Sequence, residues 1–259
     1  MIKEESRFAP SDIMEGMISF RAVVKGIRTG ISDRRIIKVL FDKSKTRVNS
    51  RHLSYIRAMS RELRFELSLC EAAEIESITV GSSHGGIVTL CTPRALPRLD
   101  ASHVAEKGFY VMLDGIEDPY NFGYALRSVC AAGADGVILP PRNWMSASGV
   151  VCRASAGAAE ELPLYVADPS SAADIFKKCG YRIACADMDN SVSLWDADLS
   201  LPLFAVIGGE KRGISSALLE KCDCVVRIDY GREFPAALSA ASAAAIISFE
   251  VLRQNSSEG

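Results

Sequence analysis

The stretch VIGGEKRGIS, residues 206–215, joins the end of an apolar run to the start of a predicted helix. The run Leu203–Ile207 is continuous and apolar, as is typical of a strand buried in a parallel sheet. Two glycines, a carboxylate and two cations follow, and Ser215 stands at the expected N-cap. A glycine pair lets a ligand approach the backbone, and open α/β sheets bind ligands at the carboxyl ends of strands. The stretch therefore predicts either a ligand-binding turn or a plain packing turn.

The chain after residue 107 alternates apolar runs with helical patterns. We expect strands at residues 109–113, 136–139, 164–167, 182–186, 203–207 and 225–228. Helices are expected at residues 121–134, 172–179, 215–221 and 237–252. The repeated β-α-β order predicts an α/β domain whose parallel sheet is covered on both faces. The last helix is nearly all Ala, Ser and Ile, which predicts close backbone packing in the core or at a subunit interface.

The first ninety or so residues predict a separate, smaller α/β unit. Helices are expected at residues 16–30 and 51–63, with strands at 35–41, 65–69 and 87–91. The segment PRALPRLD, residues 93–100, contains two prolines and few core residues, which is typical of a linker. The predicted organisation is a first domain at residues 10–92, a linker at 93–106 and a second domain at 107–255.

Positive charge is concentrated in the first of these domains. The whole chain of 259 residues has a net charge of −2, but residues 20–64 contain thirteen Lys and Arg against three acidic residues. A basic module in a neutral protein suggests a polyanionic partner, and side chains such as Arg34, Arg35 and Arg47 would contact its phosphates. The alternative is a solvated helical surface.

Composition argues against a membrane or metal-binding protein. No apolar run is long enough to span a bilayer and residues 1–6 do not resemble a signal peptide, so we expect a cytoplasmic protein with no membrane partner. Most of the eight cysteines lie in apolar runs, as reduced core residues do. Cys222 and Cys224 have no second pair and no nearby His, so no metal is expected.

A second polar stretch, LDGIEDPYNFGYALR, covers residues 113–127. Asn121 is expected to cap a helix, with Gly123 in its first turn and Arg127 one turn further on the same side. Such a helix start favours anions, because its free N–H groups and its dipole point outward. The alternative is an ordinary capped helix with one exposed arginine.

Three motifs in this order resemble the SpoU-type, TrmH-like RNA methyltransferases of the SPOUT superfamily. They are N-x-G-x-x-x-R at residues 121–127, GGEKRGIS at 208–215, and I-x-x-G followed by LSAASAAA between 228 and 245. The RASAGA run at 153–158 and the SHGGIV run at 83–88 are similar to further family features. The resemblance extends from about Gly16 to Arg253.

The resemblance implies an α/β catalytic domain whose C-terminal segment forms a deep trefoil knot. It also implies a small ribosomal-protein-like domain at the N-terminus that binds the RNA substrate. Enzymes of this family hold S-adenosylmethionine in the knot loops and form homodimers, in which the first motif of one subunit completes the site of the other. They methylate a ribose 2′-hydroxyl in ribosomal or transfer RNA.

The motifs assign roles to individual residues of this chain. Cofactor binding falls to Gly208, Gly209, Ile228 and Leu238. Catalysis falls to Arg127, Asn121, Glu210 and Ser239. Since a guanidinium stays protonated, we expect Arg127 to stabilise the developing alkoxide and to hold a phosphate, with Glu210 and Asn121 orienting it or the loops.

The third motif departs from the family pattern. The usual S-L-N is Ala237-Leu238-Ser239 here, and the loop before it is one residue longer. Ser239 keeps a hydroxyl but lacks the reach of a carboxamide. An alternative function is therefore an RNA-binding protein with weak or no catalysis that retains the fold.

Overall fold

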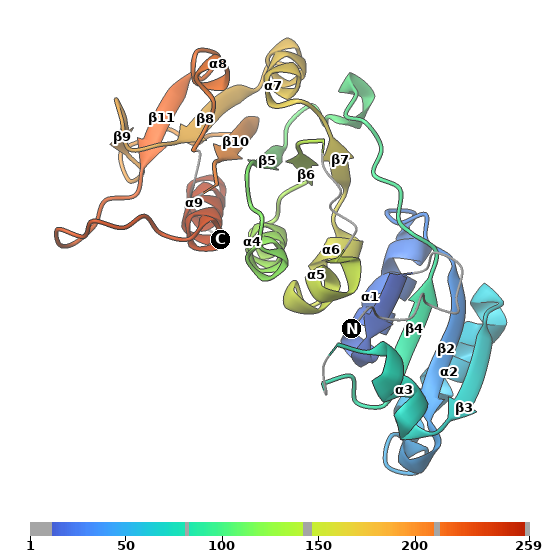
Figure 1. The fold of residues 1–259 in the computed structure, drawn as a ribbon. Helices are drawn as coiled ribbons and strands as arrows, with labels where there is room; N and C mark the ends of the chain where they lie inside the picture. The colour runs from blue at the N-terminus through green and yellow to red at the C-terminus, as the bar shows by residue number, and fades with distance from the viewer. Residues whose placement is uncertain (1–11, 81–82, 142–146, 210–212, 257–259) are drawn as a thin grey trace. The chain divides into compact units, whose positions relative to one another are not determined.

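The computed structural model describes residues 12–80, 83–141, 147–209 and 213–256. These residues form two compact units, each built on its own sheet (Figure 1). The first unit contains residues up to 95 together with 147–161, and the second contains 96–141 with 162–256, apart from 210–212. Each unit is described by itself below.

The sheet of the first unit has four strands in the order β1-β4-β2-β3. They are β1 (Asp12–Glu15), β2 (Ile36–Asp42), β3 (Glu66–Cys70) and β4 (Ile87–Cys91). β4 pairs antiparallel with β1 and β2, and β2 pairs parallel with β3. The three predicted strands are confirmed within two residues at each end, whereas β1 was not predicted.

Helices α1 (Gly16–Thr29), α2 (Ser50–Leu63) and α3 (Ala72–Ile78) accompany this sheet, with a short turn of 3-10 helix, η1, at Lys43–Lys45. The predicted end of α1 is confirmed: Gly30 has φ 73°, and its N–H donates to Ile27 O at 3.2 Å. Apolar residues of α1 and α2 such as Phe20, Val23 and Ile56 form the core with β2 and β4.

Two further helices, α5 (Ser148–Ala154) and α6 (Ala158–Glu161), belong to this first unit. They pack on α1 and β1 at distances that only glycine allows. A Cβ at Gly149 would lie 2.1 Å from Ile13 O, and one at Gly26 would lie 2.3 Å from Glu160 O. The predicted domain at residues 107–255 includes this segment, which lies in the first compact unit of the structure.

The second unit contains seven strands, all parallel, in the order β7-β6-β5-β10-β8-β11-β9. They are β5 (Phe109–Leu113), β6 (Gly136–Leu139), β7 (Leu164–Val166), β8 (Arg182–Ala186), β9 (Val192–Ser193), β10 (Leu203–Ile207) and β11 (Cys224–Arg227). The predicted parallel sheet is confirmed, and only the two-residue β9 was not predicted. Buried, uniformly apolar runs are what such strands require.

Helices cover both faces of this parallel sheet (Figure 1). On one face lie α7 (Pro169–Lys178) and α8 (Ser216–Leu219), whose Phe176 and Leu218 pack against strand residues such as Phe204. On the other face α4 (Pro119–Ala131) packs against α9 (Ala240–Asn255). In Figure 1, α4 and α9 lie side by side beneath the sheet.

The segment predicted as a linker is partly fixed to the second unit. Leu99 N–H donates to Val166 O, and Val166 N–H donates to Pro97 O, both at 2.9 Å. Leu99 is buried, and a 3-10 turn, η2, follows at Ala101–His103. Residues 97–99 therefore run beside β7 as an edge segment of the sheet.

Within the described ranges, no helix combines the length and the apolar character needed to cross a membrane. The same ranges contain no cluster of three His, Cys, Asp or Glu side chains that could hold a metal ion.

Candidate functional site

A cavity of about 430 Å³ opens at the carboxyl edge of the parallel sheet. Its walls come from the segments that follow β8, β10 and β11 and from the first turn of α9. The lining residues include Ala186, Asp187, Met188, Gly208, Gly209, Gly213, Ile228, Tyr230, Phe234, Leu238, Ala240 and Ala243. The size is that of a small-molecule site, and carboxyl edges of open α/β sheets are where such ligands bind.

The four residues predicted to bind a cofactor all line this cavity. Gly208 and Gly209 follow β10, Ile228 follows β11, and Leu238 precedes α9. These positions are far apart in the chain and meet because β10, β8 and β11 are consecutive parallel strands.

The two glycines after β10 are required by packing of the protein itself. A Cβ at Gly208 would lie 2.7 Å from the carbonyl carbon of Gly213, and one at Gly209 would lie 2.4 Å from Gly115 O. The turn is closed by Gly213 N–H, which donates to Gly209 O at 3.0 Å. Gly208 and Gly209 are therefore tightly packed against protein backbone and also line the cavity. A side chain at Gly209 would push the backbone of Gly115 aside before it filled the cavity.

The loop at residues 230–238 forms the third wall. The Tyr230 hydroxyl accepts a hydrogen bond from Leu238 N–H at 3.0 Å, which joins the two ends of the loop. Arg227 holds the base of this wall: its Nε donates to Asp229 at 2.8 Å and its Nη1 to Ser191 O at 2.6 Å. Residues 231–237 are all exposed.

Ser239, predicted as a catalytic residue, is the N-cap of α9. Its Oγ accepts the N–H of Ser242 at 3.1 Å and lies 3.0 Å from the Ser242 hydroxyl. Its neighbours Leu238 and Ala240 line the cavity. The hydroxyl is thus used in a helix cap at the edge of the cavity. Glu210, the other predicted catalytic residue of this region, lies outside the described residues.

The start of α4 differs from the sequence prediction. Asp118, not Asn121, is the N-cap: its Oδ1 accepts the N–H of Asn121 at 2.8 Å, and Pro119 occupies the first turn. The pair Asp118-Pro119 is itself a helix-start signal, since proline suits the first helical position. Asn121 and Arg127 are six residues apart, so they project about 120° from each other and do not share one side. Gly123 is buried.

Arg127 is exposed and forms no ion pair with any described residue. It shares one face of α4 with Tyr120 and Tyr124, which are 43% and 48% exposed. The adjoining helix α9 carries two more exposed apolar side chains, Phe249 and Leu252. Arg127 therefore lies on a face of α4 that also exposes two tyrosines.

Comparison with known proteins identifies the family. Residues 108–249, more than half of the chain, match the family described as the SpoU rRNA methylase family. The chain belongs to this family. A Staphylococcus saprophyticus protein assigned to the TrmH family of tRNA/rRNA methyltransferases is 33% identical over 179 residues, which cover 67% of this chain and 72% of that protein.

Solved structures support the fold of this SpoU-family chain. An S-adenosylmethionine-bound rRNA methyltransferase from Sinorhizobium meliloti superposes with a TM-score of 0.76 at 21% identity, covering 95% of this chain and 88% of that one. A structure named as an RNA 2′-O ribose methyltransferase gives a TM-score of 0.71 at 22% identity, covering 94% of this chain and 88% of that one. The expected α/β fold with a parallel sheet is thereby confirmed.

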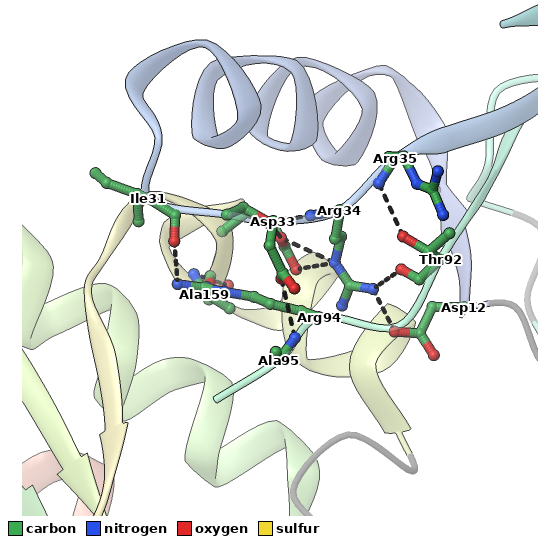
Figure 2. Close-up of polar contacts among 12 residues, drawn as sticks. Asp12, Ile31, Asp33, Arg34, Arg35, Thr92, Arg94, Ala95 and Ala159 are labelled. Atoms are coloured by element: carbon green, nitrogen blue, oxygen red, sulfur yellow. Dashed lines mark hydrogen bonds and ion pairs between the residues drawn. The ribbon is translucent and has the colours of Figure 1, made fainter. Parts of the chain in front are cut away.

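The basic first unit of this SpoU-family chain contains one arginine whose predicted role is wrong. Arg34 is only 1% exposed. Its Nε donates to both carboxylate oxygens of Glu160, at 3.1 and 3.0 Å, and its Nη1 donates to Asp12 and to Thr92 O (Figure 2). Burial alone would lower the pKa of Arg34, but the charges of Glu160 and Asp12 outweigh it and raise that pKa. Arg34 cannot contact a phosphate.

A second buried arginine, Arg94, ties the same region together. Its guanidinium donates to the carbonyl of Ala159 in α6 and to Ile31 O (Figure 2). Burial lowers the pKa of Arg94, although the nearby Glu160 carboxylate opposes this. Both arginines thus hold α6 against the segments that follow α1 and β4.

The exposed and half-buried cations of the first unit include two groups. Four are paired with carboxylates: Lys25 with Glu161, Arg28 with Glu62, Lys38 with Glu66 and Lys43 with Glu71. Others are exposed and form no ion pair with a described residue, and these are Arg21, Arg35, Arg47, Arg51, Arg57, Arg61 and Arg64. Most of the second group lies on α2 and its flanks, which is the part of the unit with free positive charge.

Proposed function

We propose that the protein transfers a methyl group from S-adenosylmethionine to a ribose 2′-hydroxyl of ribosomal or transfer RNA. One observation carries the proposal: the residues that match the cofactor motifs of the SpoU family meet around one cavity at the carboxyl edge of the sheet. S-adenosylmethionine is the ligand named for the Sinorhizobium meliloti neighbour, and 2′-O ribose methylation is the activity named for another.

The cavity suits a ligand that is partly apolar and partly polar. Ile228, Leu238 and Ala243 offer apolar surface, and Gly208 and Gly209 line the cavity with backbone that carries no side chain of its own. An adenosine with a short amino-acid arm has the same mixture. No metal is part of the proposal.

The cofactor would supply a methyl group already activated by the positive charge of its sulfonium. The chain then has to place the 2′-hydroxyl in line with that methyl and to stabilise the oxygen as its proton passes to solvent water. Correct orientation of the reacting groups lowers the activation free energy by about 7–11 kcal/mol in favourable cases. Arg127 is suited to the electrostatic part, because an exposed guanidinium without an ion pair among the described residues can hold a phosphate bidentately and stabilise a developing alkoxide. Asn121 and Glu210 have the role of orienting groups.

The active protein is a homodimer in this proposal. Tyr120, Tyr124 and Phe249 expose large apolar side chains on α4 and α9, and contiguous exposed apolar surface marks interaction sites. Arg127 lies within the same face of α4. In this proposal a symmetric partner covers this face, and Arg127 of one protomer acts at the cavity of the other. A knotted path of the C-terminal segment belongs to the same proposal.

The unpaired arginines of α2 would hold the RNA. Arg51, Arg57 and Arg61 are exposed along this helix, and Arg47 precedes it. Phosphate contacts of this kind position a nucleic acid without reading its sequence.

A second candidate function is RNA binding without methyl transfer. The observation that favours it is Ser239, whose hydroxyl caps α9 and which replaces the family's asparagine. This candidate keeps the basic helix α2 and the fold but has no reaction at the cavity.

One experiment separates the two candidates. The protein is incubated with methyl-labelled S-adenosylmethionine and total RNA from a strain that lacks the gene, and the labelled nucleotide is mapped. We expect label on a single ribose, at which alkaline cleavage stops because the 2′-hydroxyl is blocked. Label on a base would refute the 2′-O assignment, and RNA binding without any label would favour the second candidate.

A further inference from the structure

The wall of the cavity formed by residues 230–238 has an exposed aromatic ring at its rim. Phe234 lines the cavity and yet is 56% exposed. Met188, which lines the cavity from the segment after β8, is also largely exposed. One part of the Phe234 ring thus borders the cavity while the rest is open to solvent.

This ring is held in place rather than hanging from an unstructured loop. The Tyr230 hydroxyl joins the loop ends through Leu238 N–H, and Leu238 leads directly into the Ser239 cap of α9. The Tyr230 and Phe234 rings lie 6.2 Å apart between centroids, tilted by 58°. Pro235 has its own φ fixed by its ring and restricts the backbone of the preceding residue, Phe234. Tyr230 therefore positions Phe234.

The charges beside the ring offset each other. Arg232 and Glu233 are both exposed, adjacent in sequence and without an ion pair to any described residue. The loop thus differs from α2, whose free arginines attract phosphates. At the mouth of the cavity, the loop exposes the flat apolar face of the Phe234 ring.

We propose that Phe234, positioned by Tyr230, is the platform on which the base of the incoming RNA nucleotide stacks. The inference rests on the proposed function, because it supplies the base-binding part of that site. Single-stranded bases stack on aromatic side chains regardless of their identity, since every base has a π face. A base stacked at the rim leaves its ribose directed to the cavity, where the methyl group would be.

The test measures binding of the full-length protein to two probes: a short oligouridylate and an abasic ribose-phosphate oligomer of equal length. The wild-type protein binds the oligouridylate more tightly. Phe234→Ala lowers the affinity for oligouridylate by about tenfold and leaves the affinity for the abasic oligomer unchanged. Phe234→Trp keeps the wild-type preference, and Tyr230→Phe gives an intermediate loss because it removes only the hydroxyl. The salt dependence does not change, since no phosphate contact is lost.

Three outcomes would overturn the platform. Equal affinities of wild type and Phe234→Ala for oligouridylate would remove the stacking role. A fall in S-adenosylmethionine affinity in Phe234→Ala would assign the ring to the cofactor, and a weakened dimer would assign it to the protomer interface. The binding test does not depend on methyl transfer. If the protein binds bases through Phe234 but methylates no RNA, the proposed function is refuted and the role of Phe234 in base stacking stands.

Discussion

The molecule contains two regions that use the same residue types for opposite purposes. In the first unit, α5 and α6 pack on α1 and β1, and Arg34 is buried there with Glu160 and Asp12. On α4 of the second unit, Arg127 is exposed beside Tyr124 and has no ion pair with any described residue. Burial and ion pairs, not residue type, assign Arg34 to the fold, whereas Arg127 is exposed and accessible for the catalytic role that we propose.

Glycines show the same difference. A Cβ at Gly149 would lie 2.1 Å from Ile13 O, whereas a Cβ at Gly231, in the exposed loop of the cavity, would meet nothing within 4 Å. At Gly149 two backbone segments of the first unit are thus in direct contact, whereas Gly231 in the loop at the cavity has open space around it. Substitutions at matched positions in the packed region of the first unit and in the exposed site of the second unit therefore test the difference between them.

The largest expected effect is on stability, from Arg34→Ala. The substitution leaves the Glu160 and Asp12 carboxylates without their partner, and removal of one member of a buried ion pair costs about 3–5 kcal/mol. Denaturant unfolding measures the change. The exposed neighbour Arg35 is the control, since Arg35→Ala should shift the free energy of unfolding by no more than about 0.5 kcal/mol. Equal shifts for the two variants would show that Arg34 is not a structural residue.

The next effect is on activity, from Arg127→Ala. Loss of an electrostatic stabiliser of the transition state lowers the rate by about 10²–10³-fold. Stability and S-adenosylmethionine affinity should stay at wild-type levels, because the side chain is exposed and does not line the cavity. Arg182→Ala, which removes only an exposed ion pair with Asp198, is the control for single-turnover methyl transfer. Wild-type activity of Arg127→Ala would contradict a catalytic role.

A smaller effect is expected from Gly149→Ala. The added methyl group collides with the backbone of β1, and overpacking of this kind costs about 1–3 kcal/mol. The matched substitution Gly231→Ala has open space around it and should be within about 0.5 kcal/mol of wild type. Thermal unfolding compares them. If both variants were as stable as wild type, α5 would not pack closely on β1.

The smallest effect concerns the salt dependence of RNA binding. Arg51→Gln and Arg57→Gln remove exposed, unpaired cations of α2, and each should reduce the slope of log affinity against log salt by about 0.7–0.9. Lys43→Gln is the control, because Lys43 already pairs with Glu71. An unchanged slope in the arginine variants would mean that these charges form only a solvated surface.

The sequence predicted the parallel sheet well, because its central strands β5 and β10 are short, buried and uniformly apolar. Leu203–Ile207 and Phe109–Leu113 coincide with β10 and β5. It predicted helix starts less well. Asp118-Pro119 begins α4 although Asn121 was expected to, since several polar residues in one loop can each serve as a cap.

Contacts between residues far apart in the chain could not be predicted from local sequence patterns. Arg34 belongs to a basic segment by sequence, but its partner Glu160 is 126 residues away and nothing near Arg34 signals burial. For the same reason RASAGA gave no sign that α5 and α6 pack with α1. Removing residues 1–100 would strip these helices of their partners, so point variants test the basic surface more cleanly than a truncation.

The sequence brought together, as predicted cofactor-binding residues, four positions that line one cavity, but it did not indicate why two of them are glycines. The contacts that exclude a side chain at Gly208 and Gly209 come from Gly213 and Gly115. Valine at Gly209 would distort the ends of β5 and β10. A larger side chain at Ala243 is a better way to fill the cavity, because Ala243 lines the cavity from the first turns of α9. Ala245 on the same helix, outside the lining, is the matched control.

The central claim is that Arg127 of one protomer acts at the cavity of the other, and co-expression of two inactive variants tests it most directly. Arg127→Ala keeps an intact cavity, and Ala243→Leu keeps an intact Arg127, so each alone should be inactive. Random pairing makes about half of the dimers mixed, each with one intact site of two, so about a quarter of wild-type methyl transfer should return. Activity at the level of the single variants, in dimers shown to be mixed, would contradict the account.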